Sequence, residues 1–127
     1  MRNFIVSLLC LGLLIGVWAG FDSYSDTKIR NYQSDLENSI IKSVENGQWK
    51  KASEDFQTLS DDWRQYKKSA AYFLDTTTIN EADYSIAKSD YYIKAEDKSN
   101  ASGELACLKE QLAFLHYNES LALGNIF

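Results

Sequence analysis

The side chains best suited to chemistry lie near the end of the chain, where His116 and Glu119 stand three positions apart. On a helix this spacing puts an imidazole and a carboxylate on one face, where both could bind a metal ion. Two ligands from one turn do not complete a site, and metal-binding bundles use the reverse order, Glu-x-x-His. We therefore expect no metal and no other cofactor, with His116 capped or at the surface.

Glu119 is also a candidate by itself, because it interrupts an apolar stripe between Leu115 and Ala122. A buried carboxylate must be paired or hydrogen-bonded. In a bundle its neighbours would be Tyr32, Tyr66 and Lys67. Three interpretations remain open: a frayed helix end that exposes the carboxylate, a structural polar contact, or a functional role.

Three tyrosines form a second candidate group, Tyr84, Tyr91 and Tyr92. Most other aromatic residues recur at core spacing, but these three fit that spacing less well and could face a protein partner. The acidic pairs Glu54-Asp55 and Asp61-Asp62 diverge around a helix, which favours a solvated face over a cation site. The sequence has no Gly-rich phosphate loop, no Gly-x-Ser-x-Gly and no paired-cysteine motif, so we expect no enzyme activity.

The elements that would position these residues are helices. The chain has no proline, and its breaks fall at Asn46-Gly47, at residues 76–78 and at residues 99–103. The second stretch has an apolar residue every three or four positions, a period of about 3.5. These residues are Trp49, Ala52, Phe56, Leu59, Trp63, Tyr66, Ala70 and Phe73.

The other stretches have similar apolar stripes. The first has Ile29, Tyr32, Leu36, Ile40 and Val44; the third has Ile79, Ala82, Ile86 and Ile93; the fourth has Ala101, Leu105, Leu108, Leu112 and Leu115. Four such stripes joined by short turns predict an all-α fold, an antiparallel four-helix bundle made of two helical hairpins. We expect Thr78 to cap the third helix and Asn100 or Ser102 to cap the fourth.

Before these stretches lies the segment from Phe4 to Phe21, eighteen residues without a charge. As a helix it would reach roughly 27 Å, close to the ~30 Å hydrocarbon core of a bilayer. The alternative is a cleaved signal peptide, with a passable cleavage site at residues 17–19, but the run is longer than the usual apolar region of such peptides. We expect residues 1–21 to form an uncleaved membrane anchor and residues 22–127 to form a helical domain.

Charge predicts the orientation and narrows the partners. Arg2 precedes the span, whereas the charges that follow it nearly cancel, so the N-terminus is expected in the cytoplasm and the domain outside the cell membrane. That domain carries twelve basic and eighteen acidic residues, a net charge of −6. An acidic domain repels phosphate backbones, so nucleic acid is not an expected partner. Its single cysteine, Cys107, is expected to be a small buried apolar residue, with an interchain disulfide as the alternative.

The chain ends with two bulky apolar residues, Ile126 and Phe127. We expect Gly124 to end the fourth helix and these two residues to dock against the base of the bundle or at the bilayer interface. A solvated tail is the alternative.

Several short motifs together resemble the bacterial family of domains of unknown function DUF4363, which occurs largely in spore-forming Gram-positive bacteria. The motifs are the short N-terminal anchor, Trp49, Leu59, Trp63, Phe73-Leu74-Asp75, Glu104-Leu105, Leu108, Glu119 and Asn125-Ile126-Phe127. The resemblance implies an anchored helical protein and no established activity.

The functional prediction is therefore a membrane-anchored interaction or scaffold module, bound to a protein partner or to other copies of itself. The alternative is a ligand-sensing bundle. Because only Met1, Arg2 and Asn3 precede the span, such a bundle would have to signal through a partner membrane protein.

Overall fold

A computed structural model describes the backbone of residues 1–126 and the side chains of residues 1–115. Within that range the chain is helical and has no strand, which confirms the all-α prediction. The elements are α1 (Arg2–Asp35), the π-helical turn η1 (Leu36–Ile40), α2 (Ile41–Glu45), α3 (Trp49–Ala70), α4 (Thr76–Lys94) and α5 (Lys98–Ile126).

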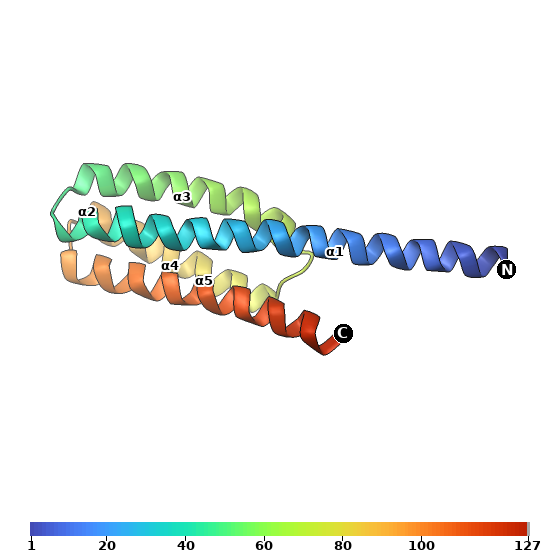
Figure 1. Cartoon of the computed structure of the whole chain (residues 1–127). Coiled ribbons are helices and arrows are strands. Elements are labelled where there is room, and N and C mark those ends of the chain that lie inside the picture. Colours follow the sequence, from blue (N-terminus) through green and yellow to red (C-terminus); the bar gives the residue numbers. More distant parts are fainter. Residues whose placement is uncertain (127) are drawn as a thin grey trace.

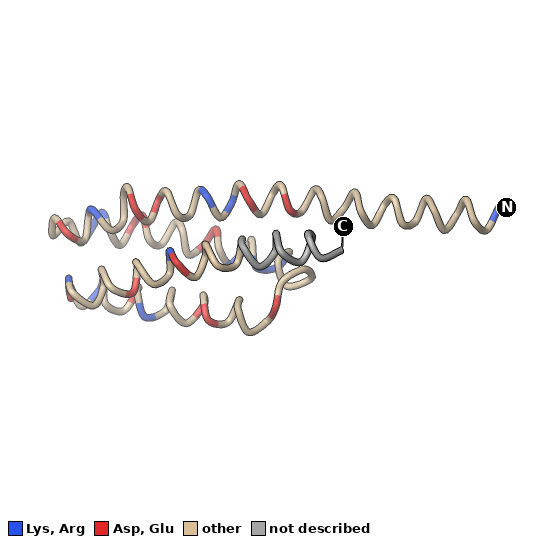
Figure 2. Tube along the Cα trace, turned by 60° about the horizontal axis from the view of Figure 1, so that its bottom comes forward, with Lys and Arg blue, Asp and Glu red and all other residues tan. Residues whose placement is uncertain are grey.

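The first three elements follow one another without a break, so a single helical rod runs from Arg2 to Glu45 (Figure 1). Its N-terminal part projects from the rest of the molecule and exposes large apolar side chains, among them Leu8, Leu13 and Val17. This part is long and apolar enough to cross a membrane, a test that signal sequences also pass. Figure 2 shows no charged residue along it between Arg2 and the point where the rod meets the other helices.

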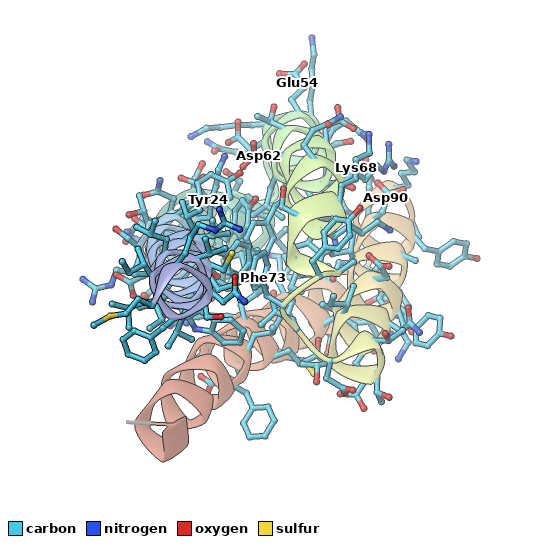
Figure 3. All side chains as sticks on the ribbon, turned by 90° about the vertical axis from the view of Figure 1, so that its right-hand side faces the viewer. Tyr24, Glu54, Asp62, Lys68, Phe73 and Asp90 are labelled. Atoms are coloured by element: carbon cyan, nitrogen blue, oxygen red, sulfur yellow. The ribbon has the colours of Figure 1, made fainter. Side chains whose placement is uncertain are left out.

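The four rods surround one core in the order α1–η1–α2, α3, α4, α5, and each contacts its two neighbours in that ring. Figure 1 shows the chain reversing at each of the three connections, and Figure 3 shows the rods end-on. All the predicted stripe residues from Ile29 to Val44, and from Ala101 to Leu115, are buried. In α3 the stripe is buried from Ala52 to Ala70, while Trp49 and the later Phe73 are only partly covered.

The stripe of the first rod explains its π-helical turn. Leu36, Ile40 and Val44 are spaced by four residues, and in an α-helix each such step rotates a side chain about 40° away from the core. At η1 the amide of Ile41 donates to the carbonyl of Leu36, five residues back, so the turn holds more residues than an α-helical turn. The wider turn keeps all three side chains buried.

The connections confirm one detail of the sequence interpretation and correct two. Asn46-Gly47 does end the first rod, with Gly47 in the left-handed region at φ 71°. Asp75, rather than Thr78, caps α4, because its carboxylate accepts from the Thr78 amide at 3.2 Å. Asp97, rather than Asn100 or Ser102, accepts from an amide in the first turn of α5, that of Asn100 at 3.1 Å.

Two further expectations were wrong. Gly124 does not end the last helix, which continues to Ile126, since a helix can include one glycine at a cost of about 1 kcal/mol. Cys107 is exposed rather than buried. Leu105 and Leu108 occupy the core-facing positions on either side of it, so the thiol points away from the core.

Candidate functional site

Aromatic rings mark the place where the projecting helix enters the bundle. Phe73, in the connection between α3 and α4, stacks on Phe21 at a centroid distance of 4.2 Å and meets the edge of Trp18 at 5.6 Å. Figure 3 shows Phe73 lying between α1 and the other helices. The rings continue inward, because Tyr66 lies 6.3 Å from Phe21 and 6.1 Å from Tyr32. Aromatic contacts therefore connect the end of the apolar segment with the middle of the bundle.

Polar contacts tie α3 to its neighbours at the same level. The hydroxyls of Ser25 and Tyr66 share a buried hydrogen bond between α1 and α3. Toward α4, the indole of Trp63 donates to Asp83 at 2.7 Å, and the ammonium of Lys67 lies 3.0 Å from the same carboxylate. Trp63 is thus fixed at its polar edge as well as by packing.

Beyond these contacts, a groove of about 310 Å³ opens between the first rod and α3. We call it the acidic groove. It is lined by Tyr32, Asp35, Ser39, Asp55, Thr58, Leu59 and Asp62. Three of the seven residues are carboxylates, and three more carry hydroxyl groups, so a ligand here would meet mainly hydrogen-bond acceptors.

Two polar contacts lie at the ends of the acidic groove. At one end the ammonium of Lys28 lies 3.0 Å from both oxygens of Asp62. At the other end the hydroxyl of Ser39 donates to Asp55 at 2.7 Å. Among the ion pairs of the described side chains, the Lys28 contact is the one that neutralises a carboxylate of this groove.

Tyr32 forms the floor of the acidic groove. Its side chain is 2 % exposed, and its hydroxyl has no partner with the geometry of a hydrogen bond. Burial, and secondarily the approach of Asp62, raises the pKa of Tyr32 well above its usual range. Asp62 therefore favours the neutral phenol, but it does not meet the hydroxyl with the geometry of a full hydrogen bond. Such a group costs free energy unless something else bonds to it.

The acidic groove was missed because the acidic pairs were interpreted as solvated. That interpretation holds for Glu54 and Asp61, which are exposed. Asp55 and Asp62 are half-buried and turn toward the first rod. Figure 3 shows the contrast, with Asp62 on the side of α3 that faces α1 and Glu54 pointing outward. Asp55 and Asp62 are seven residues apart, a spacing that returns to the same helical face. This spacing indicates that the two carboxylates lie on one side of α3.

The tyrosines singled out from the sequence lie on α4, away from the groove. Tyr84 and Tyr91 are 65 % and 70 % exposed, and Tyr92 is partly buried against the core. Tyr91 and Tyr92 meet edge to face at a centroid distance of 6.0 Å. The side chains of His116, Glu119 and Ile126, and the whole of Phe127, lie outside the described residues.

No group of three or more His, Cys, Asp or Glu side chains among the described residues is arranged to hold a metal ion. The carboxylates of the acidic groove therefore do not converge on one point. They are distributed along it.

Comparison with known proteins identifies one family. The model of the family described as Domain of unknown function (DUF4363) matches residues 23–126 of the chain. No curated protein and no solved structure matches it.

Proposed function

We propose a function from architecture alone, because the chain belongs to the DUF4363 family, whose description names no activity. The protein is a membrane-anchored interaction module that holds an acidic, antiparallel four-helix bundle at the outer face of the cell membrane. The supporting observation is the continuous rod from Arg2 to Glu45, which is apolar and uncovered at one end and part of the bundle core at the other. A helix without a break transmits its orientation to the bundle, so the bundle is presented at a defined angle.

The proposed topology follows from charge. Arg2 remains in the cytoplasm by the positive-inside rule, and the residues after Phe21 lie outside. Trp18 then lies at the outer interface, where aromatic rings are favoured, and Phe21 packs into the bundle just beyond it. The protein should resist alkaline extraction from membranes and keep its first residues. A mature chain that begins at Gly20 would show a cleaved signal peptide and overturn the anchor.

The proposed contact surface is the outward face of α4. Tyr84 and Tyr91 stand seven residues apart, so they lie on one face two turns apart, and Lys88 lies between them. Large aromatic side chains provide contact area with little loss of rotamer entropy, and they are enriched in protein interfaces. A partner protein or a second copy of the chain would cover this face.

Photocrosslinking in membranes tests this surface. A benzophenone amino acid placed at Tyr84 or Tyr91 should give a discrete crosslinked species, and one at Lys68, exposed on α3, should not. Two differently tagged copies of the chain distinguish self-association from a separate partner. Equal, diffuse crosslinking from all three positions would contradict the proposal.

A second candidate function is ligand sensing through a partner, and the acidic groove favours it. The groove lies on the same rod that carries the apolar segment, beside a π-helical turn, and such turns are frequent at functional sites. If the groove controls the contact surface, Tyr32→Phe and Asp55→Asn should change the crosslinking yield from Tyr84. Glu54→Gln, which removes a neighbouring charge outside the groove, should not. An unchanged yield in both groove variants would exclude this function.

A further inference from the structure

We propose that the acidic groove binds a linear aliphatic polyammonium ion, with one ammonium group near Asp55 and another near Asp35 and Asp62. This inference names the ligand class for the second candidate function. It rests on three observations: an unpartnered buried hydroxyl, the charge balance of the groove, and the way its carboxylates are spread.

The hydroxyl of Tyr32 shows that the site is incomplete. Tyr32 lines the groove, its side chain is almost fully buried, and no described group, Asp62 included, meets its hydroxyl with the geometry of a hydrogen bond. Buried polar groups are nearly always bonded, so an orphaned one at the floor of a groove indicates a missing partner. A neutral phenol can accept a hydrogen bond from an ammonium group, which has three donors and no acceptor.

The charge balance specifies a cation. Asp62 is paired with Lys28, whereas Asp55 accepts a hydrogen bond from the neutral hydroxyl of Ser39 and takes part in no ion pair of the described residues. Asp35 is exposed at the rim and has no ion-pair partner among the described side chains. Three carboxylates against one ammonium leave two negative charges, and an anionic ligand would be repelled.

The spread of the carboxylates specifies the shape of the cation. Asp55 and Asp62 are seven residues apart on α3, or about 10 Å along the helix. A bare metal ion needs ligands that converge within a few ångströms, and no such group is present among the described residues. A flexible chain with ammonium groups at its ends can reach both ends of the groove. Its methylenes would pass over Leu59, the apolar residue of the lining.

Calorimetric titration of the full chain in detergent micelles tests the proposal, with spermidine as the probe. We expect saturable binding to one site. Ethylenediamine, a dication too short to span the groove, should bind about tenfold more weakly because it loses one charge-assisted contact. Magnesium at equal ionic strength should not displace spermidine.

The variants locate the site. Asp55→Asn should weaken spermidine binding about tenfold, and Tyr32→Phe about fivefold, as expected for losing a charged and a neutral hydrogen bond. Glu54→Gln makes the same change of charge one residue away on the exposed face, and it should alter the affinity by less than about twofold. Asp35→Asn provides a second test at an exposed position if Asp55→Asn reduces the melting temperature.

The proposal is wrong if no saturable binding occurs, if magnesium competes equally, or if Glu54→Gln and Asp55→Asn weaken binding alike. It is also wrong if Tyr32→Phe leaves the affinity unchanged, because the orphaned hydroxyl would then not contact the ligand. Binding is measured without any partner, so its failure is distinct from that of ligand sensing. Spermidine that binds without changing the crosslinking from Tyr84 would support the ligand and refute the sensing role.

Discussion

The α1–α3 pair and the α4–α5 pair of helices pack against each other with side chains of different size. Helices α4 and α5 approach each other closely, whereas the first rod approaches α3 less through α1 than through η1 and α2. The buried face of α4 includes Ala82, Ser85 and Ser89. Between α1 and α3 lie the rings of Tyr32, Trp63 and Tyr66. Small side chains let two helices approach, and large rings hold them apart.

The consequence is a difference in the shape of the surface. The acidic groove opens beside Tyr32, one of these rings. Bulky aromatic residues thus stabilise the first pair by their contact area, and the groove lies open beside them. The second pair lacks large rings on the buried face of α4 and is better suited to be a rigid support.

Removing the largest ring should have the greatest effect. Trp63→Ala removes contacts with Tyr32 and Tyr66 and the hydrogen bond to Asp83. We expect the free energy of unfolding to fall by about 3–5 kcal/mol, measured by chemical denaturation in micelles. A melting temperature like that of the wild type would mean that the rings do not hold the first pair together.

Adding bulk should distinguish the two pairs. Ala82→Leu overfills the closely packed buried face of α4 and should cost about 1–3 kcal/mol. Thr58→Leu places the larger side chain at an exposed position in the acidic groove, and it should change stability by less than about 0.5 kcal/mol. Equal losses in the two variants would contradict the difference in packing.

The buried hydrogen bond between Ser25 and Tyr66 should contribute less than the packing that Trp63→Ala or Ala82→Leu disturbs. Ser25→Ala and Tyr66→Phe should each cost about 1 kcal/mol, and the double variant should cost less than their sum. A double-mutant cycle in denaturant measures this coupling. Strict additivity would show that the two hydroxyls do not depend on each other.

The ion pair at the end of the groove should contribute little to stability. Lys28 and Asp62 are 28 % and 42 % exposed, so Asp62→Asn should cost no more than about 1 kcal/mol, and less at high salt. The salt dependence of the unfolding free energy, compared between the variant and the wild type, measures it. A loss of several kcal/mol would indicate a desolvated pair.

The smallest expected effect is a change in the free energy of unfolding at alkaline pH. The pKa of Tyr32 is raised in the folded protein, so the neutral phenol is favoured there, and this contribution to stability is complete below the unfolded pKa of about 10. As the pH rises above that value, the unfolded state releases the proton first and stability falls. Tyr32→Phe should lack this part of the decline. An ultraviolet titration in which Tyr32 ionises with the exposed tyrosines would refute the shift.

Much of the fold was predictable from local patterns. The spacing of apolar residues identified the four core stripes, because a helix repeats its faces regardless of its neighbours. Asn46-Gly47 identified a turn, since glycine accepts the left-handed backbone that Gly47 adopts. The length of the uncharged run after Asn3 identified a segment able to cross a membrane.

The acidic groove was decided by tertiary structure. Periodicity places Asp55 and Asp62 on one helical face, but it does not say that this face meets the first rod beside large rings. The same limit applies to Tyr32, which any pattern assigns to the core. Only the assembled helices show that its ring is buried while its hydroxyl has no partner. A single helix determines which residues share a face, whereas the residues on neighbouring helices determine whether that face closes, opens or leaves a polar group unbonded.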